Sequence, residues 1–171
     1  MATTKPQGSV NPGGETSPEK KPIPKKIDPH QYITVRNGFQ GRLIYVSKRT
    51  GEKFVWENFG DEQEIELIEL KNAKNASKKF FINNWFVFED SWVIDYLGVG
   101  QFYRNALRLE DFDRVFTLSP DEIRETIGKL SAGQKRSLAY RAKELIARGE
   151  IDSNRAIAAL EESLGIELVE R

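Results

Sequence analysis

Apolar and polar residues alternate in short runs over the first part of the chain, and helix-type repeats follow. Residues 32–36, 42–47 and 53–57 are rich in β-branched and aromatic residues, and turn signals separate them. An Asn-Gly dipeptide at 37–38 favours a type I′ hairpin turn, and Gly51 suits a longer hairpin loop. We therefore predict a small antiparallel β-meander, which has to pack on helices because three short strands are marginally stable alone.

The stretch 61–74 fits two different patterns. Asp61 followed by Glu64 resembles a capping box, and the apolar residues beyond it would cover a broad side of a helix. Alternation of polar and apolar residues over 64–67 fits a strand instead. The length of the stretch and the cap favour the helix, which we expect to run to about Lys74.

Residues 80–103 hold nine of the 18 aromatic residues, so we expect this block to form the centre of the core. Each buried ring removes about 150–250 Å² from water. Within and beside the block we predict a helical turn over 76–83, a strand over 85–88, a helix ended by Gly98, and a short helix over 101–107.

Rings that alternate with cations also occur on nucleic-acid stacking platforms. Only Lys78, Lys79 and Arg104 accompany the nine rings of the block, so core packing is the favoured interpretation. A partner groove lined by one or two exposed rings is the alternative.

The last part of the chain carries clear helix start and stop signals and predicts a bundle of three helices. The expected N-caps are Ser119, Ser131 and Asp152, and the expected ends of the second and third helices are Gly149 and Gly165.

Five cations on the middle helix raise the question of DNA binding. They are Lys135, Arg136, Arg141, Lys143 and Arg148. At about 100° per residue they point in several directions around the helix. Residues 119–165 also hold eight basic and eight acidic residues, so a solvated face is favoured over a reader of DNA.

Six of the seven prolines precede residue 31, and no aromatic residue comes before Tyr32. Such a segment buries too little apolar surface to fold alone, so we predict an extended or disordered arm over 1–30. A functional alternative is an arm that lies along a neighbouring subunit. Its partner-binding residues would then be Ile23, Lys25, Lys26 and Ile27, with the lysines meeting an acidic partner.

The whole chain of 171 residues has 26 basic and 26 acidic residues, which is not the charge balance of a nucleic-acid or membrane-surface protein. It has no cysteine, which excludes disulfides, thiolate metal sites and thiol catalysis. No apolar run approaches the roughly 20 residues that span a bilayer, and the N-terminus does not resemble a secretory signal. We expect a protein that is made in the cytoplasm and has no membrane partner.

Residues suited to chemistry are scarce. The single histidine, His30, lies next to a proline in the predicted arm, and the closely spaced Asp111 and Asp113 fit a polar turn better than a metal loop. Residues 98–100 are too short for a phosphate-binding glycine loop. A carboxylate-pair hydrolase remains the enzymatic alternative. We predict no enzyme, no metal and no cofactor.

Three motifs give the chain a family resemblance. They are residues 35–39 (Val-Arg-Asn-Gly-Phe) with 41–43 (Gly-Arg-Leu), residues 78–85 (Lys-Lys-Phe-Phe-Ile-Asn-Asn-Trp) and residues 130–135 (Leu-Ser-Ala-Gly-Gln-Lys). Over about 35–171 the chain resembles small structural or accessory proteins of tailed bacteriophages and of prophages in Gram-positive bacteria. The resemblance implies a virion or assembly component and brings no catalytic residues with it.

These observations predict an α+β fold with three parts: an arm over 1–30, a body of meander and helices over 31–118, and a helical bundle over 119–171. The expected function is a structural subunit or accessory protein of a phage capsid, neck or baseplate that binds other virion proteins or itself. Its N-terminal arm is expected to anchor it to a neighbouring subunit. Its expected location is the virion. The alternative is a small phage regulator that binds nucleic acid or a host protein through the C-terminal helices.

Overall fold

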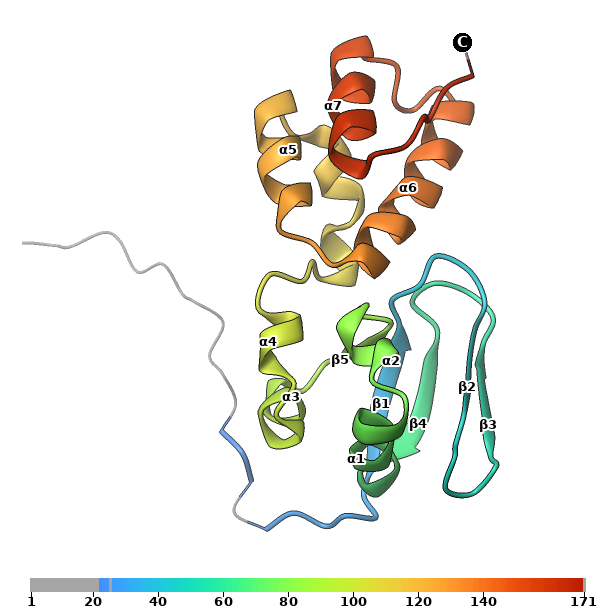
Figure 1. The fold of residues 1–171 in the computed structure, drawn as a ribbon, viewed down its shortest axis with the longest axis vertical. Coiled ribbons are helices and arrows are strands. Elements are labelled where there is room, and N and C mark those ends of the chain that lie inside the picture. Colours follow the sequence, from blue (N-terminus) through green and yellow to red (C-terminus); the bar gives the residue numbers. More distant parts are fainter. Residues whose placement is uncertain (1–21, 25, 171) are drawn as a thin grey trace, which may run out of the picture.

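A computed structural model describes residues 22–24 and 26–170 of the chain (Figure 1). Five strands lie within these residues: β1 (Tyr32–Asn37), β2 (Leu43–Val46), β3 (Lys53–Trp56), β4 (Glu62–Glu66) and β5 (Phe86–Phe88). The helices that accompany them in the first part are α1 (Leu67–Ala76), α2 (Lys79–Ile82), α3 (Ser91–Leu97) and α4 (Gly100–Tyr103). Two 3₁₀ segments, η1 (Leu109–Asp111) and η2 (Asp113–Thr117), lead to α5 (Pro120–Gly128), α6 (Ala132–Ala147) and α7 (Asn154–Leu164). The predicted α+β class is confirmed.

The strands are antiparallel, but their order is not that of a meander. β1 is the central strand of a sheet with the order β4-β1-β5, and β2 pairs with β3 in a separate hairpin. The predicted hairpin turn at 37–38 is therefore wrong. The side chain of Asn37 is buried and donates hydrogen bonds to the carbonyls of Gly41 (2.7 Å) and Asn58 (2.9 Å), which holds a wider loop. The N–H of Gly38 donates to the carbonyl of Trp85 (2.8 Å), so the chain after β1 is tied to the start of β5.

The stretch 61–74 divides between its two predicted structures. Residues 62–66 form β4, and the helix α1 begins only at Leu67. The predicted capping box does not form, because the carboxylate of Asp61 accepts a hydrogen bond from the N–H of Asn58 (2.8 Å) in the preceding turn. The alternation of residues 64–67 was the better guide to this segment.

The aromatic block lies at the centre of the first hydrophobic core, as predicted. The Phe86 ring of β5 packs on Tyr45, Trp56, Phe80 and Phe81, with ring centroids 4.9–5.7 Å apart. Helix α3 ends at Gly98 in the left-handed conformation, as expected, but the helix predicted over 101–107 is only the single turn α4. These rings join the hairpin, the central sheet and α2 into one unit.

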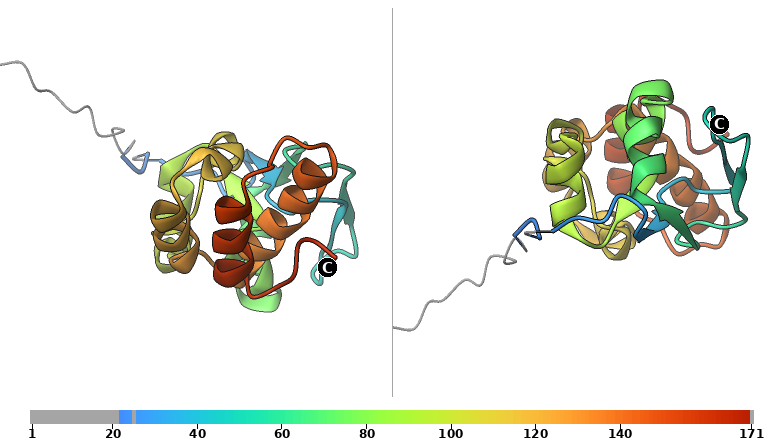
Figure 2. Two further views of the ribbon diagram at one scale, coloured as in Figure 1. Left: turned by 90° about the horizontal axis from the view of Figure 1, so that it is seen from above. Right: turned by 90° about the horizontal axis from the view of Figure 1, so that it is seen from below.

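The helices α5, α6 and α7 form the predicted bundle around a second core. Seen from above, α7 lies between α5 and α6 (Figure 2). Ser119 makes the expected capping box with Glu122, and the Ser131 hydroxyl accepts from the N–H of Gln134 (3.2 Å). The third N-cap is Ser153 and not Asp152, because the Ser153 hydroxyl accepts from the N–H of Ala156 (3.4 Å).

The two cores are joined along a seam of close backbone contacts. A Cβ atom at Gly133 of α6 would overlap Asn83, and one at Gly38 would overlap the carbonyl of Asn84. The Ser137 hydroxyl of α6 donates to the carbonyl of Gly38 (3.2 Å) and accepts from the N–H of Gln40 (3.3 Å). Both glycines are therefore required where α6 meets the sheet.

The end of the predicted arm contacts the body. Ile27 is partly buried against the first core, and the carbonyl of Pro29 accepts from the N–H of Ile68 in α1 (2.8 Å). The ring of His30 lies 2.8 Å from the carboxylate of Glu66. Residues 27–30 thus pack as part of the body rather than ahead of it.

Candidate functional site

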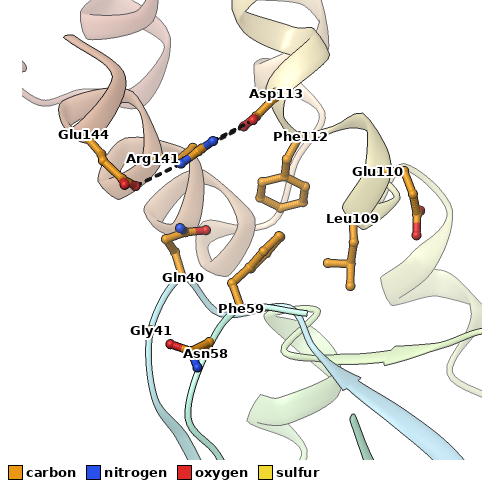
Figure 3. A pocket seen from close by; sticks show the side chains of 10 residues that line it. All are labelled: Gln40, Gly41, Asn58, Phe59, Leu109, Glu110, Phe112, Asp113, Arg141 and Glu144. Atoms are coloured by element: carbon orange, nitrogen blue, oxygen red, sulfur yellow. Dashed lines mark hydrogen bonds and ion pairs between the residues drawn. The ribbon is translucent and has the colours of Figure 1, made fainter. Parts of the chain in front are cut away.

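A cleft of about 520 Å³ lies between the two cores (Figure 3). Phe59, from the turn after β3, meets Phe112 between η1 and η2 with ring centroids 5.0 Å apart. The other residues that line the cleft are Gln40, Gly41, Asn58, Leu109, Glu110, Asp113, Arg141 and Glu144.

The charged groups of this cleft are held in ion pairs. The Arg141 guanidinium donates to both carboxylate oxygens of Asp113 (2.9 and 2.7 Å) and to Glu144 (3.0 Å). The hydrogen bond from Arg141 lowers the pKa of Asp113, and the one from Arg36 (2.8 Å) lowers the pKa of Glu110.

Low carboxyl pKa values leave both acids ionised at neutral pH, so neither can act as a general acid there. A general base works best with a pKa near the operating pH, which these acids also lack. The arrangement joins η2 to α6 by ion pairs, and we interpret the cleft as a structural junction between the cores.

A second surface has a different character. We call it the basic groove; it lies along α6 beside the end of α7 and has a volume of about 370 Å³. Its apolar part includes Tyr140 and Ile166, residues that are 54% and 37% exposed. The remaining lining residues are Ala132, Lys135, Arg136, Ala139, Lys143 and Leu164.

The three cations of the basic groove lack acidic partners within the described chain. No carboxylate of residues 22–24 or 26–170 lies within 4.0 Å of the charged nitrogens of Lys135, Arg136 or Lys143. Arg141 of the same helix and Arg148 at its C-cap, in contrast, both pair with Glu144. The five cations on and next to α6 thus separate into a paired set and an unpaired set that surrounds an exposed aromatic ring.

Of the partner-binding residues predicted in the arm, Ile23, Lys26 and Ile27 do not line this groove. Ile23 and Lys26 are exposed, and Ile27 packs partly against the body's own core. Lys25 lies outside the described residues. Their predicted role stays a prediction.

In the described part of the chain, three or more side chains of His, Asp or Glu do not come together as metal ligands would. None of its helices combines the length and the apolar character needed to cross a membrane.

Comparison of the chain with known protein families, with curated proteins and with solved structures found no match.

Sequence reasoning missed the basic groove, although a signal for it was present. Arg136, Tyr140 and Lys143 follow the spacing i, i+4, i+7, which places an aromatic ring between two cations on one face of a helix. Tyr140 lies outside the aliphatic stripe of Leu138, Ala142, Leu145 and Ile146, which is the stronger apolar signal of this helix. The contribution of Ile166, which follows α7, requires the tertiary fold.

Proposed function

We propose that this protein is a structural or accessory subunit of a larger assembly and acts by protein–protein contacts through the basic groove. The observation that carries the proposal is the exposure of Tyr140 and Ile166 beside three cations without acidic partners in the described chain. Tyrosine and arginine are enriched where proteins bind each other, since both combine apolar area with hydrogen-bonding groups. The partner would be a protein segment with apolar and acidic side chains.

A protein fits the groove better than a nucleic acid. Ala132, Ala139 and Leu164 form an apolar lining that a phosphate backbone would not cover. The chain as a whole carries no net charge, whereas binding to phosphates depends on a basic footprint. The regulator of nucleic acid is therefore the second hypothesis.

The resemblance of residues 35–171 to phage proteins supports the choice of assembly. We propose a tailed-phage particle, with the capsid, neck or baseplate as the place of the subunit and other virion proteins or further copies of the chain as its partners. The protein would be made in the host cytoplasm and end in the virion. We assign it no catalytic step and no cofactor.

The test measures how many copies of the chain are in purified particles. Quantitative mass spectrometry is expected to find the wild-type chain at a fixed ratio to the major capsid protein. The triple variant Lys135→Glu, Arg136→Glu, Lys143→Glu should lose at least about tenfold in incorporation, because it reverses the charge around the groove. Lys71→Glu, an exposed change on α1, is the matched control and should incorporate normally.

Two outcomes would count against the proposal. Absence of the wild-type chain from particles would refute the virion role. Binding of DNA that the triple variant loses, with an affinity that falls steeply as salt rises, would favour the regulator instead.

A further inference from the structure

A further groove lies beside the first hydrophobic core, along strand β2. It has a volume of about 520 Å³. One wall is formed by Ile44, Val46 and Lys48, and the other by residues 76–80, where α1 is joined to α2. We call it the edge groove.

The β2 wall of the edge groove is a strand edge that has no strand partner in the described part of the chain. Among the described strands, β2 pairs only with β3. The N–H of Ser47 donates to the carbonyl of Glu52 (2.8 Å), and bonded positions alternate along an antiparallel pair. The register therefore directs the backbone groups of Tyr45 toward β3 and those of Ile44 and Val46 toward the free edge.

The side chains at these same two positions are also uncovered. Ile44 is 39% exposed and Val46 is 50% exposed, whereas the alternate residues of the strand, Leu43 and Tyr45, are buried in the core. A strand laid against this edge would find backbone donors and acceptors together with apolar contacts at alternate residues.

The positive charge around the edge groove favours a partner strand with acidic side chains. Lys48, Lys78 and Lys79 are exposed, and no carboxylate of the described chain lies within ion-pair distance of them. The ammonium group of Lys79 lies 5.5 Å from the ring centroid of Phe80, a residue of the groove wall. Acidic side chains would complement these cations.

We propose that β2 accepts an extended, acidic segment of another protein, which adds to the β2–β3 hairpin as a further strand. The arm of a second copy does not suit the site. Residues 20–26 are basic and contain two prolines, which lack the N–H groups that strand pairing needs. The occupant is therefore a different protein, and this site is independent of the basic groove.

The test uses the full chain and a short peptide of alternating valine and glutamate with blocked ends. Amide hydrogen exchange followed by NMR should show that saturating peptide slows exchange at Ile44 and Val46 by at least about tenfold. A matched peptide methylated at alternate backbone nitrogens loses the pairing donors, so its affinity should fall by at least about tenfold.

Two variants test whether the peptide binds at the edge groove. The pair Lys78→Glu, Lys79→Glu should weaken binding of the peptide and its protection of Ile44 and Val46, while Lys71→Glu, an exposed change on α1 outside both grooves, should leave both unchanged. The proposal would be overturned by failure of the peptide to bind at millimolar concentration, by binding that leaves the amides of Ile44 and Val46 unprotected, or by equal affinity of the methylated peptide.

Discussion

The hydroxyl of Tyr45 donates a 2.6 Å hydrogen bond to the buried carboxylate of Glu69, and this bond ties strand β2 to helix α1. Arg49, in the turn after β2, donates to the other oxygen of the same carboxylate (3.1 Å). The pKa of the Tyr45 phenol is raised mainly by burial and, to a smaller extent, by its hydrogen bond to Glu69. The hairpin that carries the edge groove is thus held against the body by a buried hydrogen bond as well as by the packing of aromatic rings.

Tyr45→Phe should destabilise the protein by about 1–3 kcal/mol, because a buried carboxylate loses one of its donors. The free energy of unfolding from urea denaturation measures the effect. Tyr32→Phe removes a hydroxyl from an exposed ring and should change that free energy by less than about 0.5 kcal/mol. Equal effects of the two changes would show that the contact with Glu69 contributes nothing.

Gly133→Ala should destabilise the protein, although alanine favours a helix over glycine by about 1 kcal/mol. The new methyl group would overlap Asn83, so α6 would have to shift at the seam. Gly128→Ala, at the end of α5, meets no atom within 4 Å and should be neutral or stabilising. Opposite signs of the two changes in thermal denaturation would confirm the close contact, and a neutral Gly133→Ala would contradict it.

The ion pair between Asp113 and Arg141 predicts a loss of stability in acid. Because the folded-state pKa of Asp113 is lowered, its contribution is complete above the unfolded pKa of about 3.9 and is lost as pH falls through the folded value. Asp113→Asn should therefore flatten the fall in unfolding free energy between about pH 5 and pH 2.

Arg141→Gln removes the other member of the same pair and should flatten the pH profile in the same way. Adding Asp113→Asn to Arg141→Gln should then have little further effect, since the interaction is already lost. Additive flattening by the two changes would show that Asp113 has another stabilising partner in the folded protein.

Two truncated chains test where the body begins. A chain that starts at residue 31 lacks Ile27 and the Pro29 carbonyl that accepts from Ile68, whereas one that starts at residue 23 keeps both. The shorter chain should be less stable by at least about 1 kcal/mol, the contribution of one buried aliphatic contact with one hydrogen bond. Identical urea midpoints would place the start of the body at residue 31.

Trp85→Ala should cost about 3 kcal/mol, since the ring packs on both Phe39 and Phe80. Trp85→Phe should cost much less. The indole N–H of Trp85 is buried without an acceptor within the described chain, and phenylalanine removes that donor while it keeps most of the ring contacts. Thermal denaturation of both variants measures the difference, and equal losses would mean that the donor is satisfied by water.

Local signals were sufficient where one residue acts on its own neighbours. The Ser119 cap, the left-handed Gly98 and the aromatic core could all be predicted, because each depends on the identity of a few adjacent residues. The strand order could not be predicted, because an Asn-Gly pair such as that at 37–38 can form a two-residue hairpin turn or belong to a wider loop. In this chain the amide of Asn37 bonds to Gly41 and Asn58, and the second of these lies 21 residues away in sequence.

The binding surfaces needed tertiary information for the same reason. Ile166 reaches the basic groove only because the chain turns back after α7. Strand β2 keeps a free edge because β1 pairs with β4 and β5, and β3 is the only described strand that pairs with β2. The ion pairs of Arg141 and Arg148 with Glu144 are local in sequence, whereas the pairing of Arg141 with Asp113, outside the helix, required the tertiary fold.

The seam at Gly38 and Gly133 has a geometric consequence for whatever this protein holds. Main-chain atoms of Asn83 and Asn84 are clamped by two residues that lack side chains, which leaves little space for the helical end to swing against the sheet. The basic groove and the edge groove therefore lie on one rigid unit. If both proposed partners bound at once, their relative orientation would be fixed, so the protein would determine the orientation of its partners as well as bind them.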